Sequence, residues 1–195
     1  MKSLAGSRYI ALFVVLAALM LATRFKHVGD VLHLPDASMA IFFIGGLLLR
    51  RHLAFAAFIV MAVGLDEVSI HYAGVSDFCL TAAYAFLPLA YAVLWYAGRL
   101  YSSHLSAAAW PLAGAWGAAL IAASLSFAIS NGSFYWLGGR YANPHMAQYV
   151  ERLWQWGPLF IRTTLGYVTA ALFAYAAGSR VARWYGGHHA SGARA

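Results

Sequence analysis

The stretch AAAWPLAGAWGAALIAASLSFAI, residues 107–129, contains no charged side chain. About 20 consecutive apolar residues are enough for a helix to cross the hydrocarbon core of a bilayer. Backbone polar groups find no water there, so a segment of this kind satisfies them internally by forming a helix. Residues 107–129 therefore predict a transmembrane helix.

The composition of the whole chain agrees with this prediction. Of its 195 residues, 63% are hydrophobic and 10% are charged, and the mean hydropathy is +0.67. Soluble proteins carry roughly 25% charged residues. The net charge of +7 could suggest a nucleic-acid partner, but the basic residues punctuate the apolar segments instead of clustering on one face. We expect an integral membrane protein, one transmembrane domain over residues 1–195, with no nucleic-acid partner.

Six apolar segments predict an all-α fold with six transmembrane helices. The expected helices cover residues 9–22, 37–49, 53–67, 80–100, 107–129 and 158–177. The last three have the length of a bilayer crossing, whereas the first three need helical flanking residues to reach both interfaces. One alternative stays open: the second and third segments could form one re-entrant hairpin. The first segment also has the basic start and apolar core of a signal peptide, but we expect it to be the first helix because the next segment needs a partner to pack against.

The charged residues predict which side of the membrane each loop faces. With six spans and a cytoplasmic N-terminus, the C-terminus is cytoplasmic and the inner side holds most of the basic residues: Lys2, Arg8, Arg50, Arg51, Arg99, Arg180, Arg183 and Arg194. All acidic residues then fall on the outer side: Asp30, Asp36, Asp66, Glu67, Asp77 and Glu151. An excess of Lys and Arg on the cytoplasmic side is the usual orientation signal.

The outer connections are expected to be long and to form the binding face. They cover residues 23–36, 66–79 and 130–157, and long loops in a compact protein usually carry function. The last of them is rich in aromatic residues: Tyr135, Trp136, Tyr141, Tyr149, Trp154 and Trp156. Such residues are common at membrane interfaces whatever the function, but this number of them would suit a flat, largely apolar ligand with polar edges.

Three polar side chains on this face are candidates for ligand contacts. Asp66 follows an apolar run, so its carboxylate is expected at membrane depth facing a cavity or a partner, or else at the interface as a helix cap. Tyr84 offers a hydroxyl about one turn inside the fourth helix, unless it only packs. Arg152 could donate to a ligand carbonyl or neutralise Glu151.

Cys79 is the only cysteine of the chain, and it directly precedes the fourth apolar segment. A lone cysteine is a small buried hydrophobe, a nucleophile or a metal ligand. Zinc and iron–sulfur sites need three or four protein ligands, and the sequence has no paired-cysteine or HExxH spacing. A single thiolate suits a metal already held by a macrocycle, such as a corrin or a haem, and His27, His33 or His71 could play the same part.

Topology and four residues carry a resemblance to a known family. Six short helices, an inner N-terminus and long outer loops resemble the S-components of energy-coupling factor (ECF) vitamin transporters. Cys79 in the third loop, together with Asp66, Tyr84 and Arg152, is similar to the BtuM-type cobalamin transporters, which are solitary S-components of this fold. The resemblance implies a bacterial cytoplasmic-membrane protein, not an enzyme, that takes up cobalamin or cobinamide from the periplasmic side.

The resemblance also implies roles for these residues. Cys79 would be the axial ligand of cobalt and would hold the corrinoid base-off, while Asp66, Tyr84 and Arg152 would contact the corrin amides. Thiolate donation would weaken the bond to a trans cyanide, so loss of cyanide is expected as side chemistry. An ECF coupling module could dock on the first helix through Ala18 and Ala22, or the protein could act alone.

Two other interpretations stay open. A membrane cysteine transpeptidase resembling the exosortases would use Cys79 with Arg152 and a histidine, His145 or His71. Asp77 beside the thiol argues against it, because a neighbouring carboxylate disfavours the thiolate. An S-component for another vitamin, such as riboflavin, biotin or thiamin, would not need the thiol at all.

Overall fold

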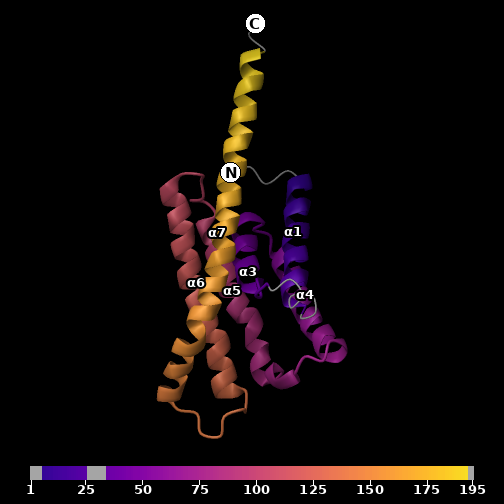
Figure 1. The fold of residues 1–195 in the computed structure, drawn as a ribbon, viewed down its shortest axis with the longest axis vertical. Coiled ribbons are helices and arrows are strands. Elements are labelled where there is room, and N and C mark those ends of the chain that lie inside the picture. Colours follow the sequence, from indigo (N-terminus) through magenta and orange to yellow (C-terminus); the bar gives the residue numbers. More distant parts are fainter. Residues whose placement is uncertain (1–5, 26–33, 193–195) are drawn as a thin grey trace.

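A computed structural model describes residues 6–25 and 34–192, and over this part of the chain the fold is all-helical, which confirms the predicted class (Figure 1). The α-helices there are α1 (Gly6–Arg24), α3 (Ser38–Leu48), α4 (His52–Tyr72), α5 (Leu87–Tyr101), α6 (Ala109–Leu137) and α7 (Met146–Gly192). Two short 3-10 helices, η1 (Asp77–Cys79) and η2 (Ala82–Phe86), lie between α4 and α5.

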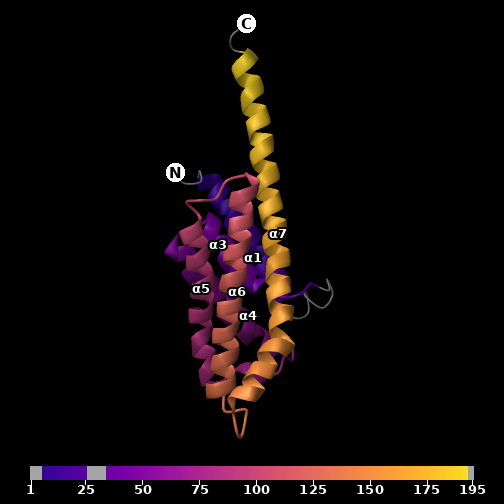
Figure 2. The same cartoon turned by 90° about the vertical axis from the view of Figure 1, so that its left-hand side faces the viewer.

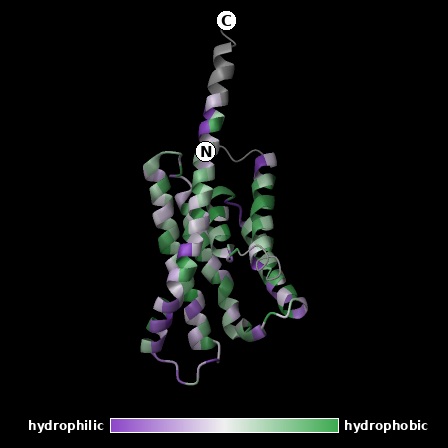
Figure 3. Ribbon diagram, viewed as in Figure 1, coloured by the Kyte–Doolittle hydropathy of each residue, from purple (hydrophilic) through white to green (hydrophobic). Residues whose placement is uncertain are grey.

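Four of these helices are long and apolar enough to cross a membrane. They are α1, α4, α6 and the Met146–Trp184 part of α7. Hydrophobic residues dominate α1 and most of α4, whereas α6 and α7 become hydrophilic toward the connection that joins them (Figure 3). Helix α3 has 11 residues, too few for a crossing, and 9 of them are buried by the helices around it. The chain is therefore a multi-pass membrane protein in which a short central helix is enclosed by longer ones.

Successive α-helices run in alternating directions, so the α3–α4 and α5–α6 connections lie toward one end of the bundle and the α4–α5 and α6–α7 connections toward the other (Figures 1 and 2). The basic end holds the start of α1, the α3–α4 turn and the α5–α6 connection, and α7 projects beyond it. Its described charged residues are all basic: Arg8, Arg50, Arg51, Arg99, Arg180 and Arg183. The acidic end holds η1, η2 and the α6–α7 connection. Its described charged residues are Asp36, Asp66, Glu67, Asp77 and Glu151 beside Arg24, Arg140 and Arg152.

The core is centred on the contact between α3 and α5. A Cβ atom at Gly46 would collide with the carbonyl of Trp95, and one at Gly98 with the carbonyl of Phe43. Small residues let two helix backbones approach closely, which is how helices gain packing energy in a membrane. Phe42 adds to this contact by stacking on Tyr91, with ring centroids 4.1 Å apart. The result is a dense centre that positions the polar residues at the ends of α1, α3 and α5.

Several helices are longer than the apolar segments predicted. Helix α4 continues to Tyr72, α6 continues to Leu137 and α7 begins at Met146, so the expected long loop over 130–157 was wrong and only residues 138–145 connect α6 to α7. A backbone can remain helical past the apolar run when its polar side chains reach the interface. Pro158 therefore lies inside α7 instead of starting it, and the helix changes direction in its first third (Figure 2).

Residues 80–100 form two elements instead of the single helix expected. The α-helix begins at Leu87, with a proline in its first turn, and residues 82–86 form η2. The hydroxyls of Ser76 and Thr81 accept the N–H groups of Phe78 and Ala83, which caps the two 3-10 turns. This break gives the α4–α5 connection, residues 73–86, a defined shape.

Candidate functional site

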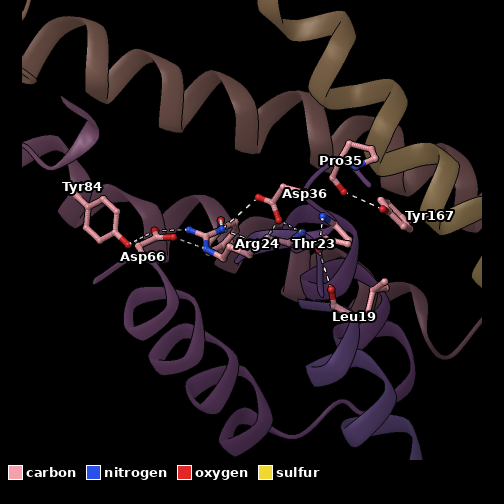
Figure 4. A network of polar contacts seen from close by, with 11 residues as sticks. Leu19, Thr23, Arg24, Pro35, Asp36, Asp66, Tyr84 and Tyr167 are labelled. Atoms are coloured by element: carbon pink, nitrogen blue, oxygen red, sulfur yellow. Dashed lines mark hydrogen bonds and ion pairs between the residues drawn. The ribbon is translucent and has the colours of Figure 1, made fainter. Parts of the chain in front are cut away.

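A network of charged and hydroxyl side chains is centred on Arg24, the last residue of α1 (Figure 4). The guanidinium donates to both oxygens of Asp66 on α4, from Nε to Oδ1 at 2.7 Å and from Nη2 to Oδ2 at 2.6 Å. Nη1 donates to the hydroxyls of Ser38 at 2.9 Å and Tyr91 at 2.8 Å. The Arg24 side chain is only 10% exposed, so its charge depends on these partners.

Asp36 connects this network to the start of α3. Its Oδ2 atom lies 3.4 Å from Nη1 of Arg24, and its Oδ1 atom accepts the N–H of Ser38 at 2.9 Å and the hydroxyl of Ser38 at 2.6 Å. Close by, the hydroxyl of Thr23 accepts the N–H of Ala37 at 3.1 Å. The ends of α1 and α3 are therefore joined by side chains as well as by packing.

Asp66 and Tyr84, two of the predicted ligand contacts, are bonded to each other. The Tyr84 hydroxyl, on η2, donates to Oδ2 of Asp66 at 2.6 Å (Figure 4). Asp66 therefore faces protein partners, one of the two environments that its position at the end of an apolar run predicted. Its main partner, Arg24, was not predicted as a site residue.

Arg152, the third predicted contact, lies in an aromatic cluster between α6 and α7. Its guanidinium carbon is 4.9 Å from the ring centroid of Tyr141 and 6.0 Å from that of Tyr135. Tyr135 is fixed in turn, because its hydroxyl donates to Oε1 of Gln148 at 2.6 Å and accepts the N–H of His145 at 2.8 Å. Nε of Arg152 is buried and has no hydrogen-bond partner among the described residues. The side chain is thus held by rings and keeps an unused donor.

Phe78, the residue before Cys79, belongs to the same aromatic cluster. Its ring centroid lies 5.6 Å from that of Phe134, which in turn lies 6.3 Å from that of Tyr141. Arg140 holds Phe78 in two ways, with Nε donating to its carbonyl at 3.2 Å and the guanidinium carbon 4.8 Å from the ring centroid. A row of rings therefore leads from η1 to the guanidinium of Arg152.

Cys79 is the last residue of η1, between Phe78 and the turn that leads to Tyr84. Its side chain lies outside the described part of the structure, as do His27 and His33, so its predicted role as a metal ligand stays a prediction. His71 is exposed at the end of α4 and lies 3.3 Å from Glu67. Among the described residues, no group of three or more His, Cys, Asp or Glu side chains is placed to hold a metal ion.

The predicted site residues thus fall into two neighbouring arrangements at the acidic end. Asp66 and Tyr84 belong to the Arg24 network, Arg152 belongs to the aromatic cluster, and the α4–α5 connection that carries Cys79 contacts both. The sequence did hold a signal for Arg24. It is a basic residue on the side where the acidic residues gather, at the end of an apolar run, where a charge needs a partner.

The chain matches no protein-family model and no curated protein. The resemblance to S-components therefore depends on topology and on the site residues themselves. Of the two alanines expected to meet a coupling module, Ala18 is exposed on α1 and Ala22 is half-buried.

Proposed function

We propose that this protein binds a cobalt corrinoid, cobalamin or cobinamide, at its acidic end and takes part in its uptake across a bacterial cytoplasmic membrane. The observation that carries the proposal is the position of the α4–α5 connection. On one side of Cys79 the chain is bonded to Asp66 through Tyr84, and on the other side it joins the row of rings that ends at Arg152. A ligand held by Cys79 would meet hydroxyl, guanidinium and aromatic groups together.

These groups suit the chemistry of a corrinoid. The macrocycle supplies four ligands to cobalt, so one axial thiolate from Cys79 completes what the protein must provide, and the nucleotide base is displaced. The corrin carries carboxamide side chains, whose carbonyls can accept from the half-buried guanidinium of Arg152 and whose N–H groups can donate to the Tyr84 oxygen. Donation by the thiolate favours loss of a trans cyanide, as side chemistry of a binding protein rather than as its main activity.

The charge distribution supports an orientation for this uptake. The basic end would be cytoplasmic, following the usual excess of Lys and Arg on that side, and the acidic end would face the periplasm, where the vitamin arrives. Six passes would require α3 and α5, which are shorter than a full crossing, to pass between the two ends of the bundle inside the longer helices, and both ends of the chain would then be cytoplasmic. A coupling module could contact the exposed Ala18 face of α1, since the chain itself has no nucleotide-binding motif.

Growth of a bacterium that cannot import cobalamin by itself, and needs it, tests the proposal. Cells that make the wild-type protein should grow on low cobalamin, and cells with Cys79→Ala should not. Glu67→Gln, which changes an exposed carboxylate next to Asp66, should grow like wild type. Equal growth with Cys79→Ala would contradict the role of the thiol, and covalent capture of a sorting-signal peptide by Cys79 would favour the transpeptidase instead.

A further inference from the structure

The α4–α5 connection, residues 73–86, packs on α6 and α5 through η2 but buries few of its side chains. Phe78 contacts the aromatic cluster but stays 49% exposed, and Phe86 is 38% exposed. Ala83 is the only described residue of the connection whose side chain is fully buried. Two polar attachments complete the set: Arg140 contacts the carbonyl and ring of Phe78, and Tyr84 donates to Asp66 at 2.6 Å. Because few side chains are buried here, we expect the bond from Tyr84 to a charged group to contribute measurably to fixing the connection.

Asp66 can hold Tyr84 only if its carboxylate is itself fixed. Arg24 provides this, since its two parallel bonds to Oδ1 and Oδ2 set the plane of the carboxylate. Arg24 is in turn bonded to Ser38 and Tyr91, which are 0% and 5% exposed and belong to the central helices α3 and α5. A chain of contacts therefore runs from the rigid core to the connection.

Asp66 and Tyr84 differ in how many free hydrogen-bond acceptor positions they can offer to a ligand. The two oxygens of Asp66 already accept three bonds from the protein. A carboxylate has about four acceptor positions, so little capacity is left. The Tyr84 oxygen has donated its single hydrogen and still has lone pairs that can accept an amide N–H.

We infer that Arg24 and Asp66 are positioning residues that act through Tyr84, and that Tyr84 is the member of this set that contacts the ligand. The inference changes the role that the resemblance implies for Asp66, from direct contact to support. It rests on the proposed function for the identity of the ligand, a corrinoid carboxamide, but its structural part does not need any ligand.

Hydrogen–deuterium exchange of the peptide covering residues 73–86 tests the structural part. Tyr84→Phe and Asp66→Asn should each speed exchange of this peptide about tenfold, the lower range for losing a bond to a charged group. Peptides from α6 should be unchanged, as should the 73–86 peptide in Glu67→Gln. Arg24→Gln alone should also speed exchange of the 73–86 peptide. The double variant Arg24→Gln/Tyr84→Phe should exchange no faster than Tyr84→Phe alone.

Two results would overturn this structural part. One is exchange in folded Tyr84→Phe protein that equals wild type. The other is a further increase when Arg24→Gln is added to Tyr84→Phe, because Arg24 would then act on the connection by another route. If Arg24→Gln does not fold, Asp66→Asn takes its place in the double variant, with the same expected result.

Cobinamide affinity tests the ligand part with the same variants. If Asp66 acts through Tyr84, the double variant Asp66→Asn/Tyr84→Phe should bind cobinamide no more weakly than Tyr84→Phe alone. Additive losses would show direct contact by Asp66 and would overturn the assignment while leaving the proposed function intact. Wild-type protein that binds no corrinoid would reject the proposed function, whereas the exchange results would still stand.

Discussion

Replacing Asp66 by Ala should strongly destabilise the protein, because it leaves the Arg24 charge without its main partner. The change removes the 2.7 Å and 2.6 Å bonds to a guanidinium that is 10% exposed. Removing one partner of a buried ion pair costs about 3–5 kcal/mol. Asp36 remains 3.4 Å from Arg24 but is 44% exposed, so it compensates for the Arg24 charge only in part. We therefore expect the free energy of unfolding to fall by about 3 kcal/mol.

Thermal unfolding of the purified protein in detergent measures this loss. At roughly 2–4 °C per kcal/mol for a chain of this size, Asp66→Ala should lower Tm by about 6–12 °C. Glu67→Ala is the matched control, since its carboxylate is 49% exposed and lies 3.3 Å from an exposed His71. Glu67→Ala should lower the free energy of unfolding by less than about 1 kcal/mol.

A double variant separates the buried charge from the loss of packing. Arg24→Met with Asp66→Leu removes both charges and replaces them with apolar volume, so it should be more stable than Asp66→Ala alone. The reasoning is refuted if Asp66→Ala unfolds at the same temperature as Glu67→Ala, or if the double variant is the least stable of the three.

Three further predictions concern the fold and the connection that carries the thiol. Gly98→Ala should cost about 1–3 kcal/mol, because the new Cβ meets a backbone carbonyl of α3, whereas Gly117→Ala, with open space around it, should be neutral or stabilising in the same thermal assay. Arg50 has φ of 66°, so Arg50→Gly should raise the unfolding free energy by about 1 kcal/mol, while Arg51→Gly, at φ of −90°, should give no such gain. Arg140→Ala removes two contacts that hold η1, and should speed deuterium exchange of residues 76–80 without changing Tm by more than a few degrees.

Hydropathy predicted the all-helical class and the short helix at 37–49, because charged Arg50 and Arg51 interrupt the chain just after it. Hydropathy did not predict where α6 ends or where α7 begins. Residues 130–157 are polar and aromatic, so no apolar run marks them, yet their backbone continues as helix to Leu137 and again from Met146. Hydropathy indicates which part of a helix has side chains suited to an environment without water. The end of the helix depends instead on where its backbone hydrogen bonds stop.

The candidate site was predictable in its residue types but not in its partners. Asp66 stood out as a carboxylate at the end of an apolar run, and Tyr84 as a hydroxyl just after the cysteine. Which donors Asp66 meets depends on how α1, α3 and α4 pack, and that packing depends on close contacts such as the one at Gly46. The sequence therefore predicts that Asp66 needs a partner, but only the folded bundle shows that this partner is Arg24.

The visible absorption spectrum of the purified protein with added cobinamide tests the central claim most directly. Coordination by Cys79 predicts that wild-type protein shifts the cobalt-corrinoid bands, and that Cys79→Ser protein, equally folded and monodisperse, leaves them as in free cobinamide. Glu67→Gln protein should show the wild-type shift. The same shifted spectrum with Cys79→Ser would contradict thiolate coordination, and no spectral change with any variant would contradict corrinoid binding at this site.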